Sequence, residues 1–332
     1  CLTVDDDDQY VYCGTTSGDV LCVQLQGPKN FKFAGPRQPI SKGVMSISFT
    51  KDGSLIVGGG DGTISVLNKD TLAKIVSKKL MGGVTSVSPF GQFNYLCGTS
   101  ESVMYLVSGR DLNATLLNTC HSERINDVAY PLGTSEIIAT CSVNDIRLWN
   151  AVKCKELLRI RVDNLECNCV CFSPSGKSIV SGWSDGKIRA FGPQSGKLLY
   201  VINDAHKITG LKKVSGALIG VTAITMTNDG SRIVSGGSDG QVRVWQITPS
   251  AQTLVASMKQ HKATINSIDI KKDNSECITA SDDGSCIVWD LERFARNNIM
   301  YAQTYFKQAR YLNDESQILT CGSDKQITYW DA

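Results

Sequence analysis

Val234-Ser235-Gly236-Gly237-Ser238-Asp239-Gly240-Gln241-Val242-Arg243-Val244-Trp245 is the clearest copy of a pattern that recurs through this sequence. Two short apolar stretches flank a tight Asp-Gly turn, which predicts a β-hairpin whose second strand ends at tryptophan. The pattern occurs eight times in 332 residues. With Gly240 as the reference turn position, the equivalent residues are Gly18, Gly62, Ser102, Asn144, Gly186, Gly284 and Lys325.

Successive turn positions are separated by 44, 40, 42, 42, 54, 44 and 41 residues. This period is typical of propeller blades, each a four-stranded sheet that buries both faces only when neighbouring blades stack on it. The sequence therefore predicts an all-β propeller fold with eight four-stranded blades, and the repeats resemble those of the WD40 family. The turn position requires a positive φ, which Gly adopts freely and Asn144 tolerates, whereas Ser102 and Lys325 predict weaker turns.

Tryptophan ends the second strand in four of the repeats, five residues after the turn position. An indole at such a place buries a large apolar area and uses its N–H in a fixed hydrogen bond. We interpret these tryptophans as core residues and not as a ligand cage. The eight strand-closing residues are Val23, Leu67, Val107, Trp149, Phe191, Trp245, Trp289 and Trp330.

The three histidines all precede a strand-closing tryptophan. In WD40 repeats, such a histidine is linked through a hydroxyl and an aspartate to the tryptophan. His121 stands 28 residues before Trp149, but Ala139 and Val143 occupy the expected polar positions, so this repeat is predicted to lack the network. Because the repeat accounts for every histidine, we expect no catalytic residue. The two predicted structural tetrads are His261, Thr279, Asp283, Trp289 and His206, Ser235, Asp239, Trp245.

Composition is that of a protein with balanced charge. The 34 Lys and Arg residues against 32 Asp and Glu leave a formal charge of +2, which gives nucleic-acid binding no electrostatic support. No apolar run approaches the ~18 residues that span a bilayer, and the start, Cys1 to Val4, lacks the basic segment of an export signal. We therefore expect a cytoplasmic protein that binds neither nucleic acid nor membrane.

The strongest metal candidate is the set Cys167, Cys169 and Cys171. Alternation predicts that all three thiols project from one face of a strand, with neighbours roughly 7 Å apart, too far for joint chelation. We interpret them as packing residues and expect no metal site. The other ten of the thirteen cysteines are interpreted as small apolar fillers that stay reduced.

Three further motifs imitate ligand sites. The run Asp5 to Asp8 is compatible with calcium, but it is placed like the solvent-facing turns of the other repeats. Gly58 to Gly62 lies on a hairpin, and Ser175 to Ser178 precedes a strand, so neither has the following helix that a phosphate-binding loop requires. The sequence predicts no cofactor.

One insertion interrupts the period. His206 precedes Trp245 by 39 residues instead of 28, and the extra residues fall within Thr209 to Ile219. Loops of this kind lie on the face where propellers usually bind partners. This loop is interpreted either as a tolerated surface insertion or as a contact for an acidic partner. The candidate contact residues are Lys207, Lys212 and Lys213, with no acidic residue among them.

Repeat quality changes along the chain, because the first three repeats contain neither histidine nor tryptophan. One interpretation places the end of a first propeller at residues 1–110 and the start of a second at residues 111–332. The alternative is one eight-bladed propeller over residues 1–332. The chain begins within an inner strand and ends after Trp330, which predicts a fragment of a longer protein.

Several less common strings add a more specific resemblance. Through them the chain resembles a family of double-propeller WD-repeat proteins of motile cilia. The resemblance implies that these repeats are the last three blades of one propeller and the first five of the next, and it does not extend to the insertion. The strings are Val4 to Asp8, Gly14 to Asp19, Gly98 to Ser102, Lys155 to Ile160, Asp185 to Phe191 and Tyr200 to His206.

This resemblance implies a non-catalytic microtubule inner protein that braces the inner junction of the ciliary doublet microtubule. The implied location is the axoneme, inside the doublet lumen, and the implied partners are α- and β-tubulin, parkin co-regulated protein and enkurin. Many weak contacts along a periodic lattice would provide the binding. The alternative is a general cytoplasmic WD40 scaffold or adaptor in a multiprotein complex. An enzyme with its site in the propeller channel is disfavoured, because no acid, base and nucleophile remain clustered outside the repeat positions.

Overall fold

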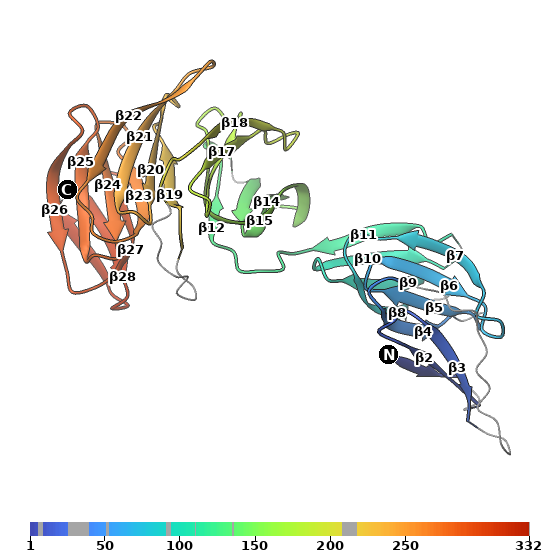
Figure 1. Ribbon diagram of the computed structural model, residues 1–332. Helices are drawn as coiled ribbons and strands as arrows, with labels where there is room; N and C mark the ends of the chain where they lie inside the picture. The colour runs from blue at the N-terminus through green and yellow to red at the C-terminus, as the bar shows by residue number, and fades with distance from the viewer. Residues whose placement is uncertain are drawn as a thin grey trace. The chain divides into compact units, whose positions relative to one another are not determined.

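The computed structural model describes residues 1–5, 9–25, 40–50, 53–90, 94–109, 111–134, 136–207 and 218–331. These residues form antiparallel strands joined by turns (Figure 1). Within these ranges no helix is long and apolar enough to cross a membrane. The prediction of an all-β fold built from propeller-type sheets is confirmed.

Contacts divide the chain into two compact units, of which the first is Cys1–Ser122. Its described strands form three antiparallel sheets in chain order. The first sheet holds β1 (Leu2–Val4), β2 (Tyr10–Gly14) and β3 (Val20–Gln24). The second holds β4 (Val44–Phe49), β5 (Leu55–Gly59), β6 (Thr63–Leu67) and β7 (Lys74–Lys79), and the third holds β8 (Val84–Phe90), β9 (Asn94–Thr99), β10 (Val103–Ser108) and β11 (Ala114–Thr119).

The second unit is Glu123–Ala332. Its first sheet consists of β12 (Asp127–Ala129), β13 (Ile137–Cys141), β14 (Val143–Asn150), β15 (Lys155–Phe172), β16 (Ile179–Trp183), β17 (Ile188–Phe191) and β18 (Leu198–Ile202). The next two consist of β19 (Val221–Met226), β20 (Arg232–Gly237), β21 (Gln241–Ile247), β22 (Gln252–Lys259), then β23 (Ile265–Ile270), β24 (Glu276–Ser281), β25 (Ser285–Asp290), β26 (Ala295–Tyr301). The last consists of β27 (Phe306–Tyr311), β28 (Gln317–Gly322) and β29 (Ile327–Asp331).

Strand β15 belongs to two blades. Its first half, from Lys155, pairs with β14 as an outer strand, and its second half, from Cys167, pairs with β16 as an inner strand. The seven-stranded sheet is therefore two successive blades joined without a break in the strand. With the other sheets, the described residues account for eight repeats, in the order that the sequence period predicted.

The end of the first unit lies after β11. The expected boundary at residue 110 falls before this strand, but Val103 to Val107 of β10 pair with β11. Strand β11 is thus the outer strand of the third sheet and belongs to the first unit.

All eight turn positions adopt a positive φ, so the prediction made for them is confirmed. The angle ranges from 55° at Ser102 to 94° at Gly18, with 68° at Asn144 and 63° at Lys325. A residue other than glycine at such a positive φ lowers the stability of the turn by roughly 1 kcal/mol relative to glycine. The hairpins at Ser102 and Lys325 nevertheless form with the same hand as the others.

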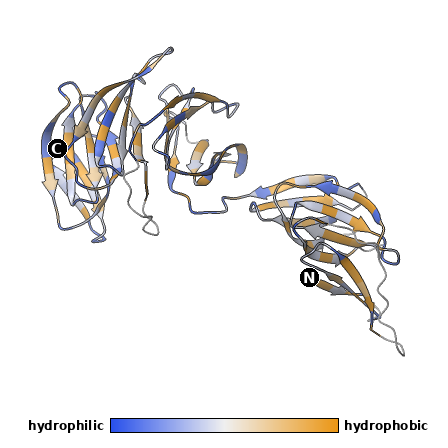
Figure 2. Ribbon diagram, in the orientation of Figure 1, coloured by the Kyte–Doolittle hydropathy of each residue, from blue (hydrophilic) through white to orange (hydrophobic). Residues whose placement is uncertain are grey.

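Figure 2 shows hydrophobic residues along the strands. Buried residues of this kind form cores between neighbouring blades. Val242 and Val244 of β21 pack with Ile265 of β23 and Trp289 of β25, although these strands belong to different sheets. Within each unit, a blade therefore buries one face of its sheet against the neighbouring blade, as the stacking of repeats requires.

A polar residue at one repeated position also fastens each inner strand of the second unit to the next. It stands 23 residues before the strand-closing residue, and from the second blade of the unit onward it is the extra residue of a β-bulge, which turns its side chain toward the neighbour. We call these four contacts the inter-blade clasps. They are Asn126 Nδ2 to Cys167 O at 2.8 Å, Asn168 Nδ2 to Val221 O at 2.8 Å, Thr222 Oγ1 to Ile265 O at 2.6 Å and Asn266 Nδ2 to Phe306 O at 2.8 Å.

The clasp at Asn168 provides a test, because this side chain is 2% exposed and donates to both Ile219 O, at 2.7 Å, and Val221 O. Replacement of Asn168 by leucine keeps the volume but leaves two carbonyls without their donor. We expect Asn168→Leu to lower the free energy of unfolding by about 1–3 kcal/mol in urea denaturation. The exposed Asn203→Leu is the control, and equal stability of both variants would contradict the clasp.

Candidate functional site

The first predicted tetrad is assembled across β24, β25 and the loop before β23. His261 Nδ1 lies 3.0 Å from Asp283 Oδ2, and His261 Nε2 lies 2.8 Å from Thr279 Oγ1. The Trp289 indole Nε1 donates to the same Thr279 oxygen at 2.8 Å. Both His261 and Trp289 are buried, so the structure brings all four residues into one internal chain of hydrogen bonds.

The contacts of this chain assign the proton positions. A carboxylate only accepts, so the Nδ1–H of His261 donates to Asp283, and in the neutral imidazole Nε2 then accepts from the Thr279 hydroxyl. The hydroxyl is thereby used twice, as donor to the imidazole and as acceptor from the indole. Every polar group of the tetrad is engaged inside the blade, which leaves none of them directed at a substrate.

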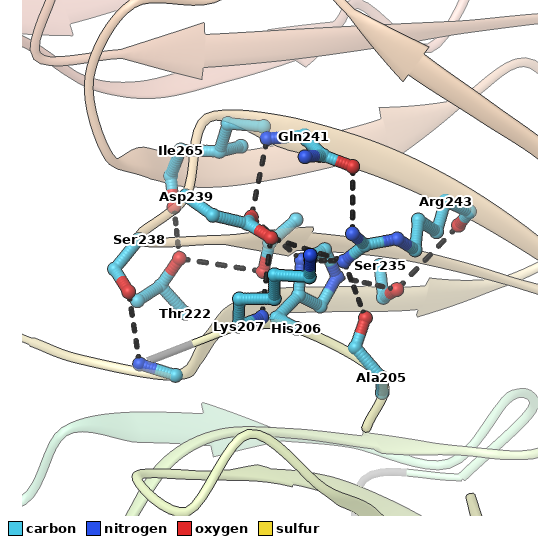
Figure 3. A network of polar contacts seen from close by, with 12 residues as sticks. Ala205, His206, Lys207, Thr222, Ser235, Ser238, Asp239, Gln241, Arg243 and Ile265 are labelled. Atoms are coloured by element: carbon cyan, nitrogen blue, oxygen red, sulfur yellow. Dashed lines mark hydrogen bonds and ion pairs between the residues drawn. The ribbon is translucent and has the colours of Figure 1, made fainter. Parts of the chain in front are cut away.

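The second tetrad repeats this geometry around Ser235. Figure 3 shows three of its members, His206, Ser235 and Asp239. His206 Nδ1 lies 2.9 Å from Asp239 Oδ1, His206 Nε2 lies 2.9 Å from Ser235 Oγ, and Trp245 Nε1 donates to Ser235 Oγ at 3.0 Å. Glycine is required beside it, because a Cβ on Gly237 would stand 2.3 Å from His206 Nδ1. The imidazole therefore occupies space that only a residue without a side chain leaves open.

Arg243 adds a cation to this tetrad. Its Nη1 donates to Ala205 O at 2.6 Å and to Asp239 Oδ2 at 3.1 Å (Figure 3). Burial lowers the pKa of His206, against the attraction of Asp239. Burial alone would raise the pKa of Asp239, but the hydrogen bond from His206 and the charge of Arg243 lower it to about 2. At neutral pH, Asp239 is therefore an ionised carboxylate and His206 a neutral imidazole.

The prediction that the His121 repeat lacks such a network is wrong in one respect. Trp149 Nε1 donates to Thr140 Oγ1 at 2.8 Å, as the other tryptophans do to their hydroxyls. The hairpin here is one residue shorter, so the hydroxyl lies nine residues before the tryptophan and Ala139 was the wrong position to inspect. Val143 still stands at the turn in place of the aspartate.

A buried ion cluster in the same blade was not anticipated. Arg147 is 1% exposed, and its guanidinium lies 2.8 Å from Asp145 and 3.1 Å from Glu156. It also stands 5.9 Å from the ring centroid of Trp149. The signal available in the sequence was the alternation of Asp145 and Arg147 on one face of a predicted strand.

Trp183, the one tryptophan outside the strand-closing register, takes part in an equivalent contact. Its indole Nε1 donates to Ser181 Oγ at 2.8 Å, and its side chain is fully buried. By repeat spacing Trp183 stands where Gly237 stands in the next blade, beside the histidine position. In the blade whose strand-closing residue is Phe191, the indole of Trp183 in β16 therefore makes the hydrogen bond that the strand-closing tryptophan makes in other blades of the second unit.

All five tryptophans thus donate to a hydroxyl at one repeated place in the second strand of each blade of the second unit. The hydroxyl residues are Thr140, Ser181, Ser235, Thr279 and Thr320, the last accepting from Trp330 Nε1 at 2.8 Å. Trp245 and Trp289 are buried, whereas Trp149 and Trp330 are half-buried, so the expectation of core positions holds fully for only two of the four strand-closing tryptophans. The first unit has Cys13, Val57 and Cys97 at the hydroxyl position.

The prediction that Cys167, Cys169 and Cys171 share one strand face is wrong for Cys167. A β-bulge interrupts the alternation between Cys167 and Cys169. Cys167 packs with Trp183 in one core, and Cys169 packs in the core on the other side of the sheet. Burial raises the pKa of all three thiols, that of Cys171 to about 12, which keeps them protonated and poor metal ligands.

Other candidate ligand residues are used locally or fall outside the described ranges. Asp5 accepts from the backbone of Gln9 and Tyr10, both at 2.8 Å, while Asp6 to Asp8 lie outside the described residues. Lys207 is exposed, and Lys212 and Lys213 lie outside the described residues with most of the insertion. Among the residues that the structure describes, no three His, Cys, Asp or Glu side chains are grouped to hold a metal ion.

Two family models match the chain. The model of the WD domain, G-beta repeat, matches residues 31–68, and the β-propeller model described as nucleolar protein 10-like, N-terminal domain, matches residues 115–327. The second match covers more than half of the chain. The chain belongs to the WD-repeat family of β-propeller proteins.

Among WD-repeat proteins, this chain is similar to cilia- and flagella-associated protein 52 over nearly its whole length. Identity is 44% over 332 residues with the Homo sapiens protein and 46% over 336 residues with that of Chlamydomonas reinhardtii, covering 99% and 100% of this chain. In both comparisons the chain spans 52% of the relative's length. WD repeat-containing protein 90 of Mus musculus is 26% identical over 70% of this chain and 13% of that protein. The predicted resemblance is confirmed at the level of sequence similarity.

Replacement of Thr279 by valine tests the shared hydroxyl. Valine has nearly the same shape, but it leaves the indole of Trp289 and Nε2 of His261 without their common partner. We expect Thr279→Val to reduce the free energy of unfolding by about 2–4 kcal/mol in chemical denaturation. Thr253→Val, at an exposed position of β22, is the matched control. A loss no greater than that of the control would show that the hydroxyl contributes nothing.

Stability is expected to fall on acidification because of the second tetrad. The pKa values of His206 and Asp239 are both lower in the folded chain than in the unfolded chain, so the unfolded chain binds protons more readily. The contribution of His206 is complete above pH ~6.5 and declines below it, and that of Asp239 declines from pH ~4 toward pH 2. Denaturation of His206→Gln at pH 7, 6 and 5 should show a shallower decline than the wild type; parallel declines would refute this assignment.

Proposed function

We propose that this chain is the propeller portion of a non-catalytic structural protein of cilia and flagella. The observation that carries the proposal is the 42–46% identity, over nearly the whole chain, to proteins named cilia- and flagella-associated protein 52 from human, pig and Chlamydomonas reinhardtii. Chance similarity among WD repeats does not account for this level, because WD repeat-containing protein 90 reaches only 26%. Since the chain spans about half of those relatives, the role is proposed for the whole parent protein.

The more detailed proposal is that the parent is a microtubule inner protein that braces the inner junction of the doublet microtubule. Its partners would be α- and β-tubulin, parkin co-regulated protein and enkurin, and its location the lumen of the axonemal doublet. Rigid blades held by the tetrads and clasps present fixed loop surfaces, and a periodic lattice multiplies weak contacts into firm attachment. The lysine contact at Lys207, Lys212 and Lys213 remains a hypothesis within this role.

A scaffold role fits the way polar groups are used. The imidazoles of His206 and His261 are buried and bonded to carboxylates and hydroxyls within their own blades. The thiols of β15 are buried and protonated. These groups stabilise the propeller, and the surfaces of the strands and turns are left to make contacts.

The second candidate function is a general WD40 scaffold or adaptor in a cytoplasmic multiprotein complex. Its support is the match of residues 115–327 to the nucleolar protein 10-like domain model, together with the similarity to WD repeat-containing protein 90. The two proposals differ in where the parent protein is retained in a ciliated cell.

Fractionation of axonemes separates these proposals. The full-length parent protein is tagged at its natural locus in a ciliated cell, and isolated axonemes are extracted with detergent and then with high salt. We expect the tag to stay on the salt-washed doublets, because a lattice-bound brace makes many contacts at once. Release with the soluble matrix, or absence from axonemes, would contradict the ciliary proposal and favour the general scaffold.

A further inference from the structure

Strand β7 is an outer edge of the first unit. It pairs with β6 on one side only, in the sheet β4-β5-β6-β7. Five of its six residues are exposed, and Ile75 has 61% of its surface accessible. An edge strand carries backbone N–H and C=O groups that are open to pairing with another chain.

This edge carries three lysines and no acidic residue: Lys74, Lys78 and Lys79. All three are exposed, and within the part of the chain that the structure describes no ion pair joins any of them to a carboxylate. The carboxylates of two nearby turns are engaged there, Asp61 with Ser41 and Thr63, and Asp111 with the backbone of Asn113. Lys79 and Lys78 act on Asp61 and Asp111 through their charge, without forming an ion pair within the described residues. The three lysines of β7 therefore exceed the two carboxylates of these turns in charge.

The other repeats show that the fold does not require these lysines. Strands β11 and β18 contain no charged residue, while β22 and β26 contain one cation each, Lys259 and Arg296. Lysine on an edge also discourages unwanted pairing, but these equivalent edges remain free of it or nearly so. In the outer half of β15, Arg159 is paired with Glu156 and Arg161 with Asp163.

The pairing register distributes the side chains of β7 over two faces. Residues directly opposite each other share a face of the sheet. Lys74 lies opposite Leu67, and Lys79 lies opposite Thr63, while Val76 lies opposite Val66. One face of the edge is therefore basic at both ends, and the other presents the half-buried Val76 beside Lys78.

We propose that β7 is a docking edge for an extended acidic segment of a partner protein, which adds a strand to the sheet β4-β5-β6-β7. Main-chain hydrogen bonds to β7 provide part of the affinity, and side chains provide the selection. Acidic residues at alternate positions of the segment face Lys74 and Lys79, and aliphatic residues between them face Val76. This surface goes beyond the ciliary proposal, since it depends only on the structure of the first unit.

Peptide binding to the purified full chain tests this surface. The probe is a fluorescein-labelled eight-residue peptide in which glutamate alternates with valine, measured by fluorescence anisotropy at low salt. We expect the double variant Lys74→Glu/Lys79→Glu to weaken binding at least tenfold, because two attractions become repulsions. The control is Lys259→Glu/Arg296→Glu, which makes the same change of net charge on β22 and β26 and should leave binding unchanged. Unaltered thermal unfolding of both variants shows that the fold is retained.

Three results would overturn the docking edge. The first is equal weakening in both double variants, which would reveal attraction to overall charge only. The second is equal binding of a peptide in which lysine alternates with valine. The third is stronger dependence on Lys74 and Lys79 for a single-stranded oligonucleotide than for the acidic peptide, which would assign the edge to nucleic acid. Failure of these tests leaves the axoneme fractionation unaffected, so the two proposals are judged separately.

Discussion

The second unit depends on one buried hydroxyl in the second strand of each blade. Five such hydroxyls each accept a hydrogen bond from an indole N–H, and the oxygens of Ser235 and Thr279 also contact a histidine. A large indole can be packed inside a blade only if its N–H finds a partner, so the hydroxyl and the tryptophan are required together. The first unit shows the converse, because its described blades have cysteine or valine at the hydroxyl position and contain no tryptophan. The change of composition along the chain therefore reflects a change from apolar packing in the first unit to indole–hydroxyl hydrogen bonds in the second.

Much of the fold could be predicted because the repeat fixes turns and strand ends locally. The positive φ at Asn144 and the hairpins followed from spacing, and the members of both complete tetrads followed from spacing together with the resemblance to WD40 repeats. The predictions failed where a repeat departs from the usual number of residues in a turn or a strand. A turn shorter by one residue moved the hydroxyl from position 139 to Thr140, and a β-bulge moved Cys167 to the opposite face from Cys169. The inter-blade clasps were missed for the same reason, since the spacing of the repeats does not reveal the bulge between β15 and β16 that aims Asn168 at the next blade.

These contacts assign polar side chains of the second unit to structural tasks. The tetrads hold two blades of the second unit internally, and the clasps hold neighbouring blades of that unit together. The outer strands take no part in the tetrads or the clasps and can differ between blades, as the lysines of β7 do. Such a division, with a uniform interior and individual edges, suits a protein that fits several neighbours in a fixed arrangement.

We propose that the parent protein is a structural component built into the doublet microtubule. This is tested by cryo-electron microscopy of doublets from ciliated cells that lack the parent, compared with cells in which it is restored. We expect density of propeller shape to be missing from the lumenal side of the inner junction in the first cells and to return in the second. Identical maps of the two doublets would contradict it.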